Sequence, residues 1–113
     1  MIDPEAARAA LLLERTGAAD LLASLTRDFT GIVDASADSN ADDEHDPEGS
    51  TIAFERSQVS TMIEQTRGRL RAVEAALVRL DDGTYGRCET CGRDIPDERL
   101  RARPVARTCV NCA

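Results

Sequence analysis

The sequence predicts an all-α fold: an antiparallel two-helix coiled-coil hairpin with a small C-terminal module at its base. Three observations favour this fold. Two stretches of about 30 residues repeat apolar side chains at helical spacing, an acidic segment separates them, and all four cysteines of the 113-residue chain fall in its last quarter. Aromatic residues make up only 3% of the chain, whereas Ala, Leu, Arg and Glu dominate, and this composition suits long helices.

The first helix is predicted from about residue 4 to residue 33. Asp3 can cap it, Pro4 suits the first helical position, and Glu5 places an acid in the first turn. Apolar residues then recur every three or four positions, with Arg15 in one slot: Leu11, Ala18, Leu22, Leu25, Phe29 and Ile32. Leu12, Leu13 and Leu21 widen this apolar face. The pattern indicates a helix that packs against a partner helix.

Residues 34–50 lose the periodicity and are predicted to form an acidic tip loop. They hold seven acids and no arginine: Asp34, Asp38, Asp42, Asp43, Glu44, Asp46 and Glu48. These seven charges equal the net charge of −7, so the rest of the chain is balanced. The lone histidine, His45, is expected to be an exposed loop residue. The next helix can begin with Asp46 as cap and Pro47 first, or with Ser50 as cap.

The second helix is predicted over residues 51–81, before Gly83 supplies a stop. Its apolar positions keep the heptad alternation of a coiled coil, with Arg56 interrupting: Ile52, Val59, Ile63, Thr66, Leu70, Val73, Leu77 and Leu80. Two helices of equal length with one connection favour an intramolecular antiparallel hairpin and a monomer. An intermolecular coiled coil is the alternative. The domains expected are a hairpin, residues 1–82, and a C-terminal module, residues 83–113.

The four cysteines form two C-x2-C pairs, Cys88/Cys91 and Cys109/Cys112, with seventeen residues between them. This spacing is typical of a structural site for one zinc ion, because two tight turns supply four thiolates in a closed tetrahedral shell. A catalytic zinc would need an open position. No signal peptide or long apolar run is recognised, so we expect a cytoplasmic protein whose cysteines are reduced and bound to metal.

All fourteen basic residues are arginine. The overall balance of charge argues against a general nucleic-acid binder, and we expect no direct sequence-specific DNA binding and no membrane partner. Arginines outnumber acids by two in residues 83–113, which could offset the −2 charge of a zinc ion with four thiolates. No nucleophile–base pair or phosphate-binding glycine loop is recognised, so an enzyme is not expected.

Residues 85–96 read Tyr-Gly-Arg-Cys-Glu-Thr-Cys-Gly-Arg-Asp-Ile-Pro, and Arg99-Leu100-Arg101-Ala102-Arg103-Pro104 precedes the second cysteine pair. These motifs resemble the four-cysteine zinc finger of the DksA/TraR family, over about a quarter of the chain. The order of helix, acidic tip, helix and finger extends the resemblance to nearly all of it.

The resemblance implies a zinc-binding transcription regulator that binds RNA polymerase and takes part in the stringent response. Its hairpin would enter the secondary channel of the polymerase and bring an acidic tip near the catalytic magnesium. In this chain the tip acids would be Asp42, Asp43, Asp46 and Glu48. Arg99, Arg101 and Arg103 would contact the polymerase or compensate charge, and Tyr85 would pack between finger and hairpin.

The chain also departs from the family. The family tip reads D-x-x-D-x-A, but the ungapped positions here are His45, Glu48 and Ser50, and a D-x-x-D pair occurs at Asp43 and Asp46 instead. The basic positions linked to guanosine tetraphosphate fall at Gln65 and Ala72, so synergy with this alarmone is not expected. No counterpart of the C-terminal helix that longer members use as a further polymerase contact is expected. The alternative functions are a non-catalytic coiled-coil adaptor and a thiol-based redox switch.

Overall fold

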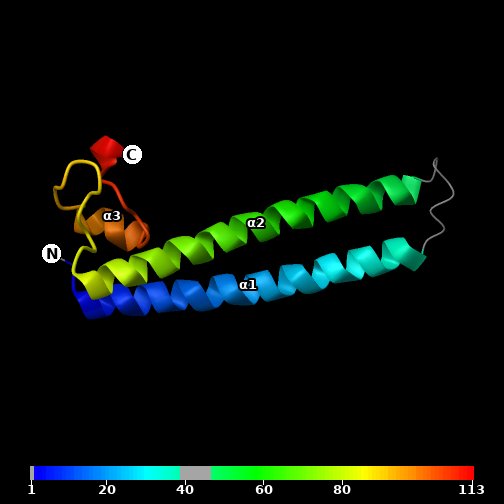
Figure 1. Ribbon diagram of the computed structural model, residues 1–113, viewed down its shortest axis with the longest axis horizontal. Coiled ribbons are helices and arrows are strands. Elements are labelled where there is room, and N and C mark those ends of the chain that lie inside the picture. The colour runs from blue at the N-terminus through cyan, green and yellow to red at the C-terminus, as the bar shows by residue number, and fades with distance from the viewer. Residues whose placement is uncertain (1, 39–46) are drawn as a thin grey trace. The chain divides into compact units, whose positions relative to one another are not determined.

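The computed structural model describes residues 2–38 and 47–113. Two long helices, α1 (Pro4–Asp38) and α2 (Pro47–Asp82), precede a short helix α3 (Asp97–Ala102) and a 3-10 turn η1 (Val110–Cys112) (Figure 1). Within these described ranges the only β pairing is an isolated bridge between Arg87 and Asp94. The predicted all-α fold with two long helices is confirmed. None of the described helices is long and apolar enough to cross a membrane.

Both long helices extend farther than predicted. Residues 34–38 continue α1 and residues 47–50 begin α2, where the sequence predicted a loop. Once a helix is nucleated, each further residue adds a hydrogen bond, so unfavourable local composition need not end it. The start of α2 at Pro47 agrees with the first of the two predicted starts, and Glu48 therefore lies in its first turn. Asp42, Asp43, His45 and Asp46 lie outside the described residues.

The helix ends follow the predicted signals. The Asp3 carboxylate accepts a hydrogen bond from the Glu5 backbone at 3.2 Å, which caps α1. At the end of α2, Gly83 has a φ of +77°, a conformation that side chains with a Cβ rarely adopt. The Gly83 N–H donates to the Leu80 carbonyl and the Thr84 N–H to the Arg79 carbonyl, the two bonds of a Schellman motif. This turn leads the chain directly into the cysteine-containing segment.

The contacts divide the chain into two units, which we call the base unit (residues 1–17 and 69–113) and the distal unit (residues 18–68). The base unit therefore groups the N-terminal turns of α1 and the C-terminal turns of α2 with the finger, rather than separating them at residue 82. Whether residues 1–82 and 83–113 are distinct folding domains stays a prediction.

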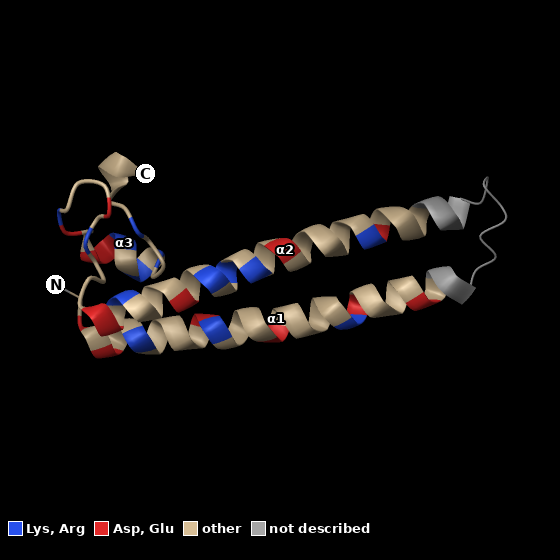
Figure 2. Cartoon of the chain, viewed as in Figure 1, with Lys and Arg blue, Asp and Glu red and all other residues tan. Residues whose placement is uncertain are grey.

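In the base unit α1 and α2 run antiparallel. Leu11 of α1 is fully buried and lies in one cluster with Val73, Ala76 and Leu77 of α2. Ion pairs flank this cluster and join early residues of α1 to late residues of α2: Arg8–Asp81 at 2.6 Å, and Arg15–Glu74 and Arg69–Glu14 at 3.8 Å. Figure 2 shows acidic and basic positions on both helices. The apolar seam thus holds the two helices together in the base unit. The ion pairs are exposed to water and contribute little to the stability of the folded state.

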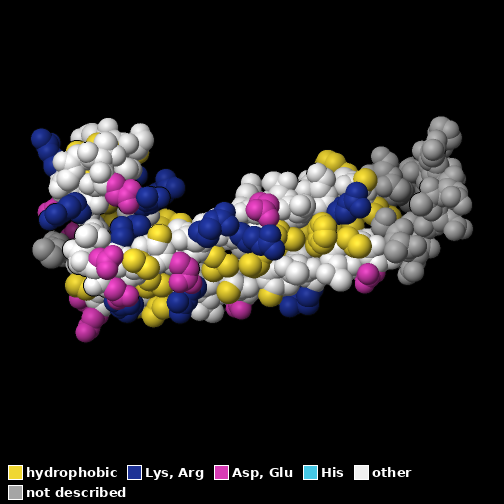
Figure 3. All heavy atoms as spheres, in the orientation of Figure 1, with side chains coloured by type: hydrophobic (Ala, Val, Ile, Leu, Met, Phe, Trp, Pro, Cys, Tyr) yellow, Lys and Arg dark blue, Asp and Glu magenta, His cyan; other side chains and the backbone are white. Residues whose placement is uncertain are grey.

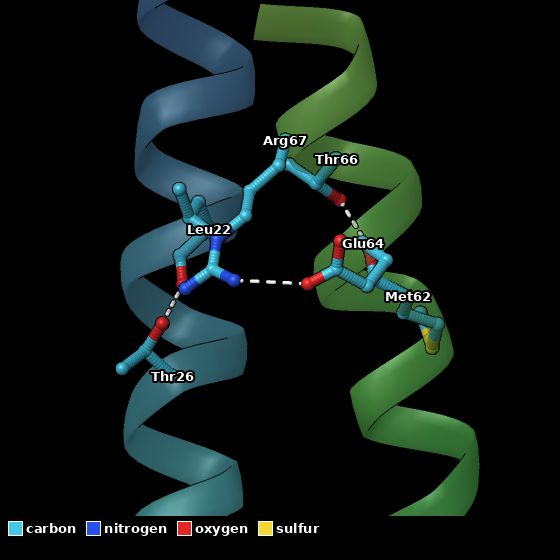
Figure 4. Close-up of polar contacts among 6 residues, drawn as sticks. All are labelled: Leu22, Thr26, Met62, Glu64, Thr66 and Arg67. Carbon is cyan, nitrogen blue, oxygen red and sulfur yellow. Dashed lines mark hydrogen bonds and ion pairs between the residues drawn. The ribbon is translucent and has the colours of Figure 1, made fainter.

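In the distal unit the same two helices pack through Ala18, Leu25 and Ile63. Thr66, a predicted seam position, is 3% exposed, and its hydroxyl donates to the Met62 carbonyl at 2.7 Å, so no polar group is left unpaired there (Figure 4). Leu13 of the base unit is different: it is 76% exposed, although the sequence placed it on a widened apolar face. The apolar seam is therefore narrower than the leucine content suggests.

Candidate metal centre

The two cysteine pairs come together in the finger. The Sγ atoms of Cys88, Cys91, Cys109 and Cys112 all lie within 4.8 Å of one another. The Sγ atoms of Cys91 and Cys109, one from each pair, are 3.8 Å apart. Cys88 and Cys109 are buried, Cys112 is half-buried and Cys91 is exposed. Four sulfurs from two separate turns thus surround one point, as the spacing predicted.

Backbone hydrogen bonds shape the first cysteine turn. The Gly92 N–H donates to the Cys88 carbonyl at 3.0 Å, and the Cys88 N–H donates to the Arg93 carbonyl at 2.8 Å. Gly92 has a φ of +74°, so glycine is needed at this place for conformational reasons. In the second turn, the Cys112 N–H donates to the Cys109 carbonyl at 3.1 Å. In each pair the tight turn brings both sulfurs to the same side.

The thiols affect one another's protonation. Backbone hydrogen bonds from Cys91 and then Cys109 stabilise the Cys88 thiolate and lower its pKa to about 6. The hydrogen bond with the Cys109 side chain, followed by burial, raises the pKa of Cys112 to about 12. The last of four crowded thiols therefore resists ionisation when no cation is present. A divalent, thiophilic cation removes this obstacle, and a tetrahedral set of four thiolates is the ligand set that zinc prefers.

A second cluster supports the sulfurs. Cys88 and Cys109 are buried with Ile95, Leu100 and Ala106, and Tyr85 packs against both this cluster and the apolar seam of the base unit. The Tyr85 hydroxyl donates to the Pro104 carbonyl at 2.8 Å, and burial raises the pKa of this phenol. Tyr85 therefore has the predicted position between finger and hairpin.

The arginines of the finger have different surroundings. Arg107 binds both carboxylate oxygens of Glu89, with distances of 2.9 to 3.0 Å, and this contact lowers the pKa of Glu89. Arg99 is half-buried and its Nε donates to the Thr108 carbonyl at 2.8 Å. Arg101 and Arg103 are exposed. Figure 3 shows basic side chains spread over the visible face of the finger.

The sequence did not predict the contacts of Arg107 with Glu89 and of Arg99 with Thr108. It also did not predict the hydrogen bond from Arg79 to the Val105 carbonyl at 3.4 Å. Burial lowers the pKa of Arg79. The motif Arg99-Leu100-x-Ala102-x-Pro104 marked these residues without identifying their partners, which in the structure are Thr108 for Arg99, the finger core for Leu100, and Tyr85 for Pro104.

The fold and the cysteine cluster define the class: a helical-hairpin protein with a four-cysteine zinc finger. Residues 83–113 match the family described as prokaryotic DksA/TraR C4-type zinc finger. The chain is 43% identical over 72 residues to general stress protein 16O of Bacillus subtilis, covering 64% of this chain and 44% of that protein. It is 37% identical over 49 residues to the RNA polymerase-binding transcription factor DksA of Escherichia coli K12, covering 43% and 32% respectively.

A solved structure of transcription factor DksA2 from Pseudomonas aeruginosa has the same fold, with a TM-score of 0.82 and 21% identity, over 96% of this chain and 78% of that one. The C-terminal finger of this chain is therefore similar to that of the DksA/TraR family, and the fold of the chain is similar to that of DksA2. The family match and the cysteine cluster together support one structural zinc ion in the finger. The matches span less than half the length of the two curated relatives described above.

Proposed function

We propose that this protein is a zinc-binding transcription regulator that binds RNA polymerase through its secondary channel. The observation that carries the proposal is the combination of a DksA/TraR finger with an antiparallel pair of long helices in one chain. A relative that is 37% identical to this chain over 49 residues is described as an RNA polymerase-binding transcription factor. Cys88, Cys91, Cys109 and Cys112 are the zinc ligands in this proposal, and the ion is structural, because four thiolates leave no open position for a reacting water.

The acidic residues between α1 and α2 and in the first turn of α2 would act near the catalytic magnesium of the polymerase. Its proposed residues are Asp42, Asp43, Asp46 and Glu48. Magnesium prefers oxygen ligands, so carboxylates at the connection of two packed helices suit this position. The exposed Arg101 and Arg103 of the finger would contact the polymerase outside the channel. We further propose a cytoplasmic monomer without enzymatic activity and without sequence-specific DNA binding.

A transcription assay with purified polymerase tests the proposal. The wild type is compared with a tip variant in which Asp43, Asp46 and Glu48 are replaced by alanine. The control variant removes the same number of exposed acids from the distal unit, by replacing Asp20, Asp28 and Glu55. We expect the tip variant to bind polymerase but lose the effect on transcription, and the control to keep both properties. An unchanged effect in the tip variant, or an equal loss in both variants, would contradict a role of the tip.

A further inference from the structure

The two cysteine turns are far apart in the chain, because seventeen residues separate Cys91 from Cys109. A connection of this length leaves the second turn free to adopt many positions relative to the first, unless other contacts fix it. Zinc–sulfur bonds are about 2.3 Å long and require tetrahedral directions. Contacts that hold the second turn in place without the sulfurs therefore decide how much conformational entropy this turn loses when zinc binds.

Among the described residues, three polar contacts hold the second turn without the sulfurs, two of them with Glu89 of the first turn and one with α3. The Glu89 N–H donates to the Arg107 carbonyl at 2.9 Å, and the two side chains of this pair form the ion pair described above. The third contact is the hydrogen bond from Arg99 to the Thr108 carbonyl at 2.8 Å. The Glu89–Arg107 side chains are 43% and 61% exposed, so water screens their ion pair and its contribution is small. The Arg99 bond is partly buried and has a charged donor, which makes it the stronger side-chain link.

Arg99 is itself held in place. It lies in α3, where its N–H donates to the Pro96 carbonyl at 3.0 Å and its carbonyl accepts from the Arg103 N–H at 2.7 Å. The next residue, Leu100, is 2% exposed and anchors α3 in the finger core. Gly86, which lies against Leu100, has a φ of +84°, so its backbone conformation favours glycine, whereas a Cβ there would make only an ordinary contact with Leu100 at 3.4 Å. Helix α3, which Leu100 anchors in the finger core, therefore holds Arg99 where its guanidinium reaches the Thr108 carbonyl.

We propose that Arg99 is a positioning residue of the metal centre, which fixes the second cysteine turn through the carbonyl that directly precedes Cys109. The inference rests on the proposed set of four cysteine ligands. Arg99 does not contact the ion; it restricts the backbone from which Cys109 reaches it. With this restraint in place, less conformational freedom is lost on metal binding, so the affinity for zinc is higher.

Zinc affinity, measured by competition with a chromophoric chelator under reducing conditions, tests the role. We expect Arg99→Gln to weaken zinc binding about 10-fold, the lower end of the range for residues that support metal ligands. Arg99→Lys should recover part of the loss, since an ammonium group can still donate one hydrogen bond to the carbonyl. Arg101→Gln, an equal change at an exposed arginine of the same helix, should bind zinc like the wild type.

Two measurements separate positioning from general destabilisation. In the cobalt-loaded proteins, the visible absorption of the thiolate-bound ion should change in Arg99→Gln and not in Arg101→Gln, because it reports ligand geometry. Val73→Ala, which weakens the buried seam of the base unit, should lower stability without changing zinc affinity or the cobalt spectrum. Should Arg99→Gln not fold, the Arg99→Lys and Arg101→Lys pair replaces it, with weaker zinc binding expected only in the former.

The zinc measurements give different results if the four-cysteine site is wrong and if only the role of Arg99 is wrong. A wild type that takes up no zinc would refute the four-cysteine site itself. A wild type that binds one zinc ion while the Arg99 variants show the wild-type affinity and cobalt spectrum would refute only the role of Arg99. An affinity loss in Arg99→Gln that Val73→Ala reproduces would also overturn it.

Discussion

Replacement of Leu11 by alanine should destabilise the base unit strongly. Leu11 is 0% exposed and packs against Val73, Ala76 and Leu77 across the two helices. Truncation of a fully buried leucine removes its transfer free energy and leaves a cavity, which together amount to about 2–5 kcal/mol. Leu13→Ala is the matched control, because this leucine is 76% exposed two positions away. The same chemical change there should alter the free energy of unfolding by at most about 0.5 kcal/mol.

Urea denaturation of the zinc-loaded proteins, followed by circular dichroism, measures both effects. With a urea slope of about 1–3 kcal/mol per molar for a small protein, Leu11→Ala should lower the midpoint by roughly 1 M or more. Saturating zinc must be kept constant, since a ligand that binds the folded state shifts the apparent stability. Equal midpoint shifts for Leu11→Ala and Leu13→Ala would refute the position of the seam, and with it the packing of α1 against α2 in the base unit.

Three further predictions concern Tyr85, two glycines and the zinc ion. Tyr85→Phe removes the hydrogen bond to Pro104 and should lower stability by about 1 kcal/mol; an unchanged thermal midpoint would show that this bond does not matter. Gly17→Ala should stabilise α1 by up to about 1 kcal/mol, because a Cβ there meets no atom within 4 Å. Gly83→Ala should instead destabilise by about 1 kcal/mol, because φ is +77°; urea midpoints that move in the same direction would contradict this contrast. Removal of zinc by a chelator should change the fluorescence of Tyr85, the only tyrosine, and retain most of the helical circular dichroism. Complete loss of the helical signal would mean that α1 and α2 cannot pair without the ion.

The apolar seam could be predicted because apolar residues that recur with a period of 3.5 to 3.6 residues are visible directly in the sequence. Leu11, Ile63, Val73 and Leu77 are buried as that period requires. The width of the seam could not be predicted in the same way, since two helices bury a narrow stripe and leave residues such as Leu13 in water. The α1 helix ends five residues beyond its predicted end at residue 33, and α2 begins four residues before the predicted bound of residue 51, because local composition does not report how far an established helix continues.

The cysteine spacing predicted the cluster of sulfurs, because ligands of one ion must converge whatever the path between them. The hydrogen bonds that support the four-cysteine cluster could not be predicted from the sequence. Arg99 was interpreted from its charge alone, as a partner contact or as compensation for the metal site. Its bond to Thr108 depends on how α3 folds back over the second turn, and this is a tertiary relation between residues nine positions apart.

Equilibrium binding of the zinc-loaded protein to purified bacterial core RNA polymerase tests the proposed function most directly. A one-to-one complex with an affinity in the micromolar range or tighter is expected, and Leu11→Ala, which weakens the paired helices, should bind less well than Leu13→Ala. No complex at micromolar concentrations of an intact protein that carries one zinc ion would contradict the assignment as a polymerase-binding regulator.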